Sequence, residues 1–176
     1  MRNAIAVALL TSALGAGCAD EGTTENAATS ETATASLQPK SDNKTLAGTA
    51  TFEGAPGNIK LTLDVSGAPA GEHGVHIHEK GDCSSADAMS AGGHWNPNMS
   101  DHAAPGPSAH LGDLGNMTVG ADGKGSLSAS NAQWEIGTGS PKDLIGKALI
   151  VHTMPDDLMT QPTGNAGGRI GCGEIK

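Results

Sequence analysis

The chain has 176 residues, enough for one domain of ordinary size. It carries 10 Lys plus Arg against 19 Asp plus Glu, a formal net charge of −9, so it cannot build the basic surface that nucleic-acid binding requires. Aromatic residues make up only 2% of the chain while glycine reaches 26 residues, so a core must come from aliphatic side chains held between many turns.

Residues 1–17 have the pattern of an export signal. A cation at Arg2 precedes an apolar run of about eleven residues, which is shorter than the ~20 needed to span a bilayer, and small residues follow it. Cys18 comes directly after these small residues, which resembles a bacterial lipoprotein box, whose thiol is acylated and becomes the mature N-terminus. The pattern predicts a signal peptide over 1–17 and lipidation of Cys18. The alternative is ordinary cleavage near this position, which leaves a free thiol.

Residues 19–45 are rich in Ala, Thr, Ser, Glu and Asn, and Leu37 is their only large apolar side chain. Such a segment buries too little apolar surface to offset its ordering entropy, so we expect a disordered tether over 18–45. The lipid would then be the only membrane contact of a folded domain over 46–176 in a bacterial cell envelope, on the periplasmic side. Ala19, rather than Asp, follows the cysteine, which favours delivery to the outer membrane.

From about Leu46 onward, short alternating runs are separated by turn residues. Residues 59–65 place an apolar side chain at every second position, the period of a half-buried strand. Residues 117–119 and 126–129 flank an Asp-Gly pair and predict a hairpin, and residues 144–151 are a further candidate strand. Many short strands at close spacing predict an all-β antiparallel sandwich or barrel.

Two stretches, 81–111 and 155–168, resist assignment to strands. Long loops on a small β scaffold are usually functional. We therefore expect the functional residues of this chain to gather around these two loops.

The seven histidines all lie between positions 73 and 152. His76 and His78 are two residues apart in a strand-like run, so both lie on one face, about 7 Å apart, close enough to hold one metal ion. The other candidates, mostly in the first long loop, are His94, His102, His110, Asp113 and His152. Six histidines and a carboxylate exceed what one tetrahedral zinc site needs, so the sequence predicts two metal ions.

If Cys18 carries lipid, Cys83 and Cys172 remain, in an oxidising compartment where disulfides persist. A bridge between them would close a loop of roughly ninety residues, which is worth roughly 4–5 kcal/mol in the chain-entropy model. Two buried free thiols are the alternative.

Four separated motifs, in this order along the chain, resemble those of copper/zinc superoxide dismutases. They are Gly74-Val75-His76-Ile77-His78-Glu79, Ala91-Gly92-Gly93-His94-Trp95-Asn96-Pro97, His110-Leu111-Gly112-Asp113-Leu114-Gly115-Asn116 and Gly164-Asn165-Ala166-Gly167-Gly168-Arg169-Ile170-Gly171-Cys172-Gly173. The resemblance runs from about Leu46 to the C-terminus. It implies the family's fold, an eight-stranded antiparallel Greek-key barrel of immunoglobulin-like sandwich type. It also implies the family's activity, disproportionation of superoxide to dioxygen and hydrogen peroxide.

The resemblance further implies one copper and one zinc ion per chain. The copper ligands would be His76, His78, His94 and His152, and the zinc ligands His94, His102, His110 and Asp113. Four neutral nitrogens suit the tetragonal geometry of Cu(II), whereas three nitrogens and a carboxylate form the closed tetrahedral set of a structural zinc site. His94 would bridge the two ions as an imidazolate, which two adjacent cations make favourable.

The same resemblance assigns catalytic roles to two residues. Arg169 corresponds to the arginine beside copper that attracts and orients the anionic substrate, as a local cation does in an acidic domain. His94 would take up a proton when its bond to copper breaks during turnover.

Three further residues receive supporting roles from the resemblance. Asp156 matches a carboxylate that links a copper ligand to a zinc ligand and so orients both imidazoles. Cys83 and Cys172 match the family's intrasubunit disulfide. His73 is expected to be a structural histidine and no ligand.

Some features leave alternatives open. Residues 157–163 are shorter and less charged than the corresponding loop of eukaryotic members, which puts long-range steering of superoxide in doubt, and the chain could be a monomer or a homodimer. A protein that only buffers copper or zinc would use the same ligands but would need neither Arg169 nor an open copper face. A hydrolytic zinc enzyme is disfavoured because a side chain fills every zinc position.

Overall fold

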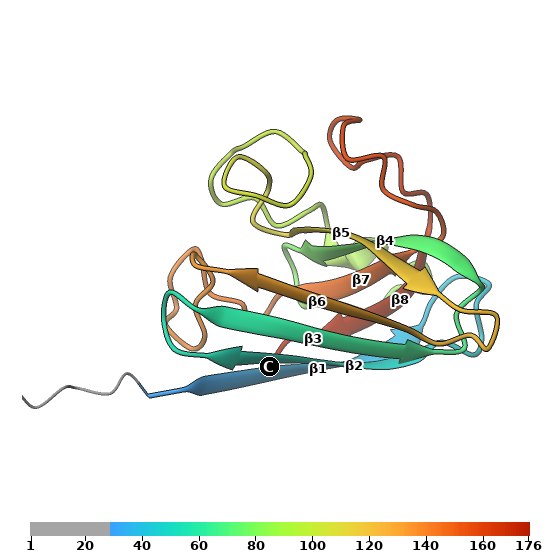
Figure 1. Ribbon diagram of the computed structural model, residues 1–176, viewed down its shortest axis with the longest axis horizontal. Coiled ribbons are helices and arrows are strands. Elements are labelled where there is room, and N and C mark those ends of the chain that lie inside the picture. Colours follow the sequence, from blue (N-terminus) through green and yellow to red (C-terminus); the bar gives the residue numbers. More distant parts are fainter. Residues whose placement is uncertain (1–28) are drawn as a thin grey trace, which may run out of the picture.

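The computed structural model describes residues 29–176, and in this part of the chain eight strands close into one barrel (Figure 1). Around the barrel the strands follow the order β1-β2-β3-β6-β5-β4-β7-β8, and every neighbouring pair is antiparallel. The predicted eight-stranded antiparallel barrel is confirmed. The strands are β1 Glu31–Pro39, β2 Ala47–Gly54, β3 Ile59–Ser66, β4 Gly71–His78, β5 Asp113–Val119, β6 Gly125–Asn131, β7 Ala148–His152 and β8 Arg169–Glu174.

The order of the strands makes the topology a Greek key. Strand β3 pairs with β6, while β4 lies between β5 and β7. The β3–β4 and β6–β7 connections therefore join strands that are not neighbours. This arrangement places β4, β5, β7 and β8 side by side under the two long loops.

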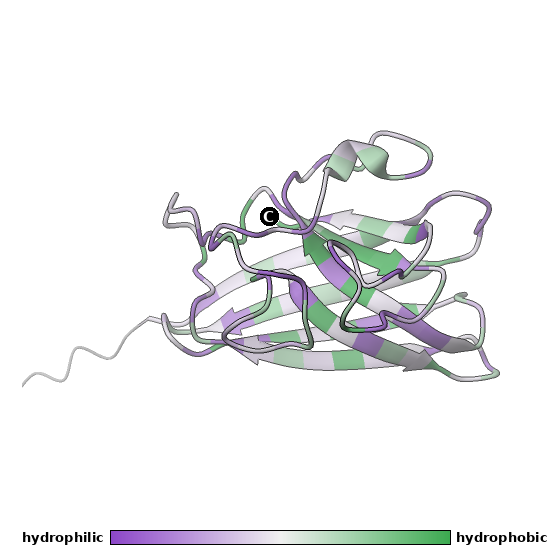
Figure 2. Cartoon of the chain, turned by 90° about the horizontal axis from the view of Figure 1, so that it is seen from above, coloured by the Kyte–Doolittle hydropathy of each residue, from purple (hydrophilic) through white to green (hydrophobic). Residues whose placement is uncertain are grey.

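The core follows from the period-2 pattern of the strands. In β3, Ile59, Leu61, Leu63 and Val65 are buried while the residues between them are exposed, as predicted for 59–65. Figure 2 shows the same alternation of hydrophobic and hydrophilic residues along the neighbouring strands. At one end of the barrel Phe52 and Trp134 close the core, with ring centroids 5.7 Å apart in an edge-on contact.

Strand β1 corrects the predicted tether. Residues 31–39 are part of the barrel: they pair with β2 over seven positions and with β8 at Gln38 and Pro39. Ala33, Ala35 and Leu37 point inward and are each 1% exposed. Buried and exposed positions do alternate along β1, but two of its three buried apolar residues are alanines. In the sequence this segment therefore resembles a low-complexity stretch, and its pattern does not predict a strand. The predicted signal peptide and Cys18 lie outside the described residues.

The predicted hairpin is confirmed, and one predicted strand is too long. Strands β5 and β6 meet at a turn in which Gly123 has a φ of +74°, a conformation that favours glycine. Strand β7 covers only Ala148–His152, because residues 144–147 form a turn closed by a 3.1 Å hydrogen bond from Lys147 N to Leu144 O.

The two long loops join β4 to β5 (79–112) and β7 to β8 (153–168), and Figure 1 shows both on the same side of the barrel. The first contains a short 3-10 helix, η1, at Met89–Ala91. A disulfide between Cys83 and Cys172 ties this loop to β8, with Cα atoms 5.8 Å apart. Within residues 29–176, no helix has the length and apolar character needed to cross a bilayer.

Candidate metal centre

Strand β4 supplies the first two histidines of the site. Val75 and Ile77 point into the barrel core, so His76 and His78 project from the opposite face. That face is buried as well, because the long loops cover it: His76 is 0% and His78 is 1% exposed. An isolated β-bridge between His78 and His94 brings the first loop alongside the strand.

The structure gathers the predicted copper ligands into one group. One ligand atom from each residue lies within 4.8 Å of the others, and all four residues are buried. They come from three places: two from β4, one from the first long loop and one from the end of β7. The group consists of His76, His78, His94 and His152.

The predicted zinc ligands form a second group that shares His94 with the first. The carboxylate of Asp113, the first residue of β5, lies at its centre. Its Oδ1 is 2.9 Å from Nδ1 of His94 and 3.2 Å from Nδ1 of His110, and its Oδ2 is 3.0 Å from Nδ1 of His102. Three nitrogens and a carboxylate therefore converge on one small volume, as a tetrahedral zinc ion requires.

The hydrogen bonds of the site test whether metal ions fit. Within residues 29–176, five histidine ring nitrogens are buried without a hydrogen-bond partner: His76 Nδ1, His78 Nε2, His94 Nε2, His102 Nδ1 and His152 Nε2. All five belong to the two groups. The 3.0 Å approach of His102 Nδ1 to Oδ2 of Asp113 does not have the geometry of a hydrogen bond. A buried polar atom without a hydrogen-bond partner lowers the stability of a protein by about 1–3 kcal/mol. Five such nitrogens in one place therefore indicate that they bind a ligand.

The second ring nitrogen of these histidines is held in place. Nδ1 of His78 is 2.9 Å from Gly92 O, and Nδ1 of His152 is 3.2 Å from Gly167 O. These contacts fix the ring so that the unpartnered nitrogen faces the group, as is usual for metal-ligating histidines. The donor set and its orientation thus fit metal ions.

Asp156 holds one histidine of each group. Its Oδ2 is 2.8 Å from Nε2 of His76, and its Oδ1 is 2.9 Å from Nε2 of His102. Burial alone would raise the pKa of Asp156, but hydrogen bonds from His76, the Leu158 N–H and His102 outweigh burial and lower it to about 2. This carboxylate therefore accepts from both imidazoles, which is the link predicted from the sequence.

Asn116 and Gly164 support this carboxylate, and sequence reasoning gave neither a role. Asn116, in β5, receives a 2.7 Å hydrogen bond from Asp156 N and donates one of 2.8 Å to Asp156 O. A Cβ atom at Gly164 would lie 1.8 Å from Oδ1 of Asp156, so only glycine leaves room there. Both residues lie inside motifs already noted, but their contacts depend on how the loops fold.

Three histidines of the copper group, His76, His78 and His152, are held neutral and are therefore available as ligands. Burial lowers the pKa of His76 to about 4 and that of His152 to about 3, and it lowers the pKa of His78 well below its usual value. A neutral imidazole has a free lone pair, which is the form that binds a metal ion.

A cavity of about 320 Å³ opens this group to solvent, and its lining includes His78, His94 and His152. Arg169, the first residue of β8, also lines the cavity. Its guanidinium donates to Ala88 O at 2.6 Å and to Gly92 O at 2.7 Å, which fixes its position. Burial lowers the pKa of Arg169 and the nearby Asp87 opposes this, yet an arginine remains charged in proteins.

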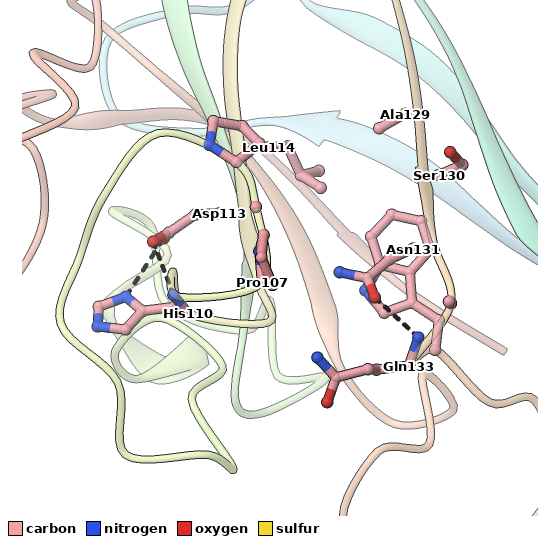
Figure 3. A pocket seen from close by; sticks show the side chains of 12 residues that line it. Pro107, His110, Asp113, Leu114, Ala129, Ser130, Asn131 and Gln133 are labelled. Carbon is pink, nitrogen blue, oxygen red and sulfur yellow. Dashed lines mark hydrogen bonds and ion pairs between the residues drawn. The ribbon is translucent and has the colours of Figure 1, made fainter. Parts of the chain in front are cut away.

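A second cavity, of about 330 Å³, lies on the outer side of the zinc group (Figure 3). His110 and Asp113 lie on one side of it, with Asn131 and Gln133 across from them. No side chain of the copper group lines this cavity. The two groups therefore face solvent through different openings.

His73 lies apart from both groups. Nδ1 of His73 is 2.7 Å from His152 O, and its Nε2 is 2.8 Å from Pro69 O. Both ring nitrogens are thus engaged, so this histidine is structural, as expected.

Comparisons with known proteins agree with this geometry. The family model described as copper/zinc superoxide dismutase (SODC) matches residues 46–175. A curated relative, extracellular superoxide dismutase [Cu-Zn] of Caenorhabditis elegans, is 41% identical over 137 residues. The match covers 74% of this chain and 61% of the relative, so this chain spans about three fifths of the relative's length.

Solved structures show the same fold. A SOD-like protein from Bacillus subtilis superposes with a TM-score of 0.70 at 32% identity, covering 80% of this chain and 96% of that one. The clock protein EA4 gives a TM-score of 0.71 at 34% identity, covering 82% and 92% of the two chains.

Proposed function

The chain belongs to the copper/zinc superoxide dismutase family, and on this basis we propose that it disproportionates superoxide to dioxygen and hydrogen peroxide. One observation carries the proposal. Two groups of possible metal ligands share His94, and the four-histidine group opens into a cavity that also holds Arg169. A buffering protein needs the ligands, but it does not need a fixed cation beside an open ligand set.

One copper and one zinc ion per chain fit the donor sets. His76, His78, His94 and His152 would hold copper, which supplies the one-electron redox chemistry when bound. His94, His102, His110 and Asp113 would hold zinc, for which a closed set of side chains indicates a structural role.

His94 is the residue that moves a proton. Its two ring nitrogens face different groups: Nδ1 lies 2.9 Å from Asp113, while Nε2 is buried and unpartnered on the copper side. When Nε2 is not engaged by the copper group it can hold a proton, and it can then deliver that proton to the reduced oxygen species at the cavity floor.

Arg169 binds and orients the anion. The Ala88 and Gly92 carbonyls hold its guanidinium in the cavity that His78, His94 and His152 line. A fixed cation in a low-dielectric pocket raises the local concentration of an anionic substrate. The net charge of the chain is −9, and Arg169 is the one Lys or Arg side chain in the lining of this cavity, so it supplies the side-chain attraction for superoxide there.

A metal-buffering protein is the alternative from another class. Elemental analysis of the purified protein should give one copper and one zinc per chain. Superoxide decay followed after a radiolysis pulse should be much faster with the loaded protein than with buffer alone, and slower again with Arg169→Ala. Tight binding of both metals without any faster decay would favour the buffer.

We also propose that the chain is exported and held at a bacterial envelope by a lipid on Cys18. The sequence pattern of residues 1–18 supports this, and the printed name of the nematode relative describes an extracellular protein. Mass spectrometry of the membrane fraction should find a diacylglyceryl group on Cys18. A soluble mature chain without that group would refute the lipid anchor and leave the activity untouched.

A further inference from the structure

Methionines are unusually exposed in this protein. Among the described residues, four of the five exposed large hydrophobic side chains are methionines: Met89 at 61%, Met99 at 90%, Met154 at 45% and Met159 at 77%. Met117 is the only buried one in this part of the chain. Methionine is ordinarily among the most buried residue types, so packing in the core does not explain why these four side chains are present.

Met89 lies at the cavity of the copper group. It lines the same cavity as His78, His94 and His152. Its backbone is fixed, because Met89 N donates to Oδ1 of Asp87 at 3.0 Å and Arg169 clamps the preceding carbonyl, that of Ala88, at 2.6 Å. The structure thus holds a flexible, exposed thioether at a defined place beside the entrance.

A second exposed thioether, that of Met154 in the other long loop, lies behind the cavity wall at Gly167. Met154 N donates to Ala166 O at 3.0 Å, and Ala166 and Gly167 line the cavity. A Cβ added at Gly167 would lie 2.9 Å from Cε of Met154, so this methionine packs directly against the cavity wall. Met99, although more exposed, does not line the cavity.

Thioether side chains bind Cu(I) in preference to Cu(II) or Zn(II). Thioether sulfur is a soft ligand that favours Cu(I), whereas Cu(II) and Zn(II) favour imidazole and oxygen. His78, His94 and His152 line the same cavity, and the Nε2 atom of each is buried without a hydrogen-bond partner. A Cu(I) ion at the sulfur therefore has nitrogen ligands next to it to which it can pass by ligand exchange, with no change of oxidation state.

We propose that Met89, assisted by Met154, forms a transient Cu(I)-binding site at the cavity mouth, through which copper enters the four-histidine group. The inference rests on the proposed copper site, but it concerns metal uptake and needs no turnover. It gives a role to Met89 and Met154, which belong to neither predicted set of metal ligands and do not bind the anion.

Copper uptake tests the proposal directly. The full chain, loaded with zinc and free of copper, is mixed without oxygen with Cu(I) held by bicinchoninate, and the loss of the coloured chelate gives the uptake rate. Met89→Leu, which keeps size and apolarity but removes the sulfur, should take up Cu(I) several-fold more slowly and reach the same final copper content. Met99→Leu is the matched control and should load at the wild-type rate, as should Met89→Leu supplied with Cu(II).

A spectroscopic measurement shows which sulfurs are involved. In zinc-loaded protein labelled with 13C at the methionine methyl groups, whose four-histidine group has first been filled with Cu(I), further Cu(I) should shift the signal of Met89 first and that of Met154 next, and leave that of Met99 in place. Unchanged Cu(I) uptake by Met89→Leu, or equal slowing by Met99→Leu, would overturn the proposal. Because neither measurement uses superoxide, a chain that binds copper without dismutating superoxide would still support it.

Discussion

The carbonyl oxygen of Gly92 accepts a 2.7 Å hydrogen bond from Nη2 of Arg169. The same oxygen lies 2.9 Å from Nδ1 of His78, whose Nε2 is the unpartnered nitrogen of the copper group. One peptide group therefore fixes both the cation that orients the anion and a ligand of the metal. Gly92 adopts a φ of +77° to place this carbonyl, and a Cβ there would lie 2.3 Å from Oε1 of Glu79.

Replacing Arg169 should slow superoxide decay without removing copper. Arg169→Ala removes the only Lys or Arg side chain that lines the cavity, and we expect the second-order rate constant to fall by about tenfold or more. Arg169→Lys keeps a charge but lacks the planar guanidinium whose two nitrogens each donate to one carbonyl, so its rate should lie between those of the wild type and Arg169→Ala. The decay rate and the copper content are measured on the same samples, and a full rate in Arg169→Ala would contradict the assigned role.

The negative charge of Asp87 should weaken the attraction of superoxide by Arg169. Asp87 and Arg169 are the only Asp, Glu, Lys or Arg side chains that line the cavity. Hydrogen bonds from the Met89 N–H and the Ser85 hydroxyl hold the pKa of the Asp87 carboxyl below its usual value, so it is charged at neutral pH. Opposite charges that line one solvent-filled cavity attract each other weakly, so removing the negative charge by Asp87→Asn should speed superoxide decay by about two- to fivefold at low salt.

The gain from Asp87→Asn should shrink as ionic strength rises, because salt screens exposed charges. Asp122→Asn is the control, since Asp122 is also an exposed aspartate that accepts from a backbone N–H two residues on, that of Lys124, but it lies outside the cavity. If both variants raise the rate equally, the effect reflects net charge and not the place of Asp87.

The residue types predict metal ligands, because imidazoles and a carboxylate are what metal ions bind, and the resemblance to the family divides them into two sets. The structure brings together every ligand of both sets. The sequence predicts strands where large apolar residues alternate, as in β3, and fails where alanines carry the alternation, as in β1. The contacts of Asn116, Asp87 and Met89 could not be predicted, since they depend on how two loops distant in sequence fold over one face of the barrel.

Strand β1 should be essential to stability although it precedes the part of the chain that matches the family model. Leu37→Ala removes a side chain that is 1% exposed, and we expect a loss of about 2–5 kcal/mol in the free energy of unfolding. Ser36→Ala, at the exposed neighbouring position, should change it by less than about 0.5 kcal/mol. Urea unfolding with the disulfide intact measures both, and equal small effects would mean that β1 contributes nothing to the barrel.

Asp156 should govern how tightly both metals are held. Asp156→Asn replaces one of two accepting oxygens by an NH2 group, so only one of His76 and His102 keeps its present contact. Loss of such an orienting carboxylate typically costs about 10–100-fold in metal affinity, and we expect that range for zinc in competition with a chelator. Asp157→Asn is the control, because the side chain of Asp157 is exposed and accepts hydrogen bonds from Met159 and Thr160 in its own turn. An equal loss in the two variants would contradict the linking role.

The division of ligands between the two ions can be tested by metal content. His152 belongs to the copper group alone and Asp113 to the zinc group alone, whereas His94 belongs to both. His152→Ala should therefore lose copper and keep most of its zinc, Asp113→Ala should lose zinc first, and His94→Ala should weaken both. Elemental analysis after dialysis against a weak chelator measures each case. Equal loss of zinc from His152→Ala and Asp113→Ala would show that the two groups do not act as separate sites, because a residue that contacts only copper has no direct means of releasing zinc.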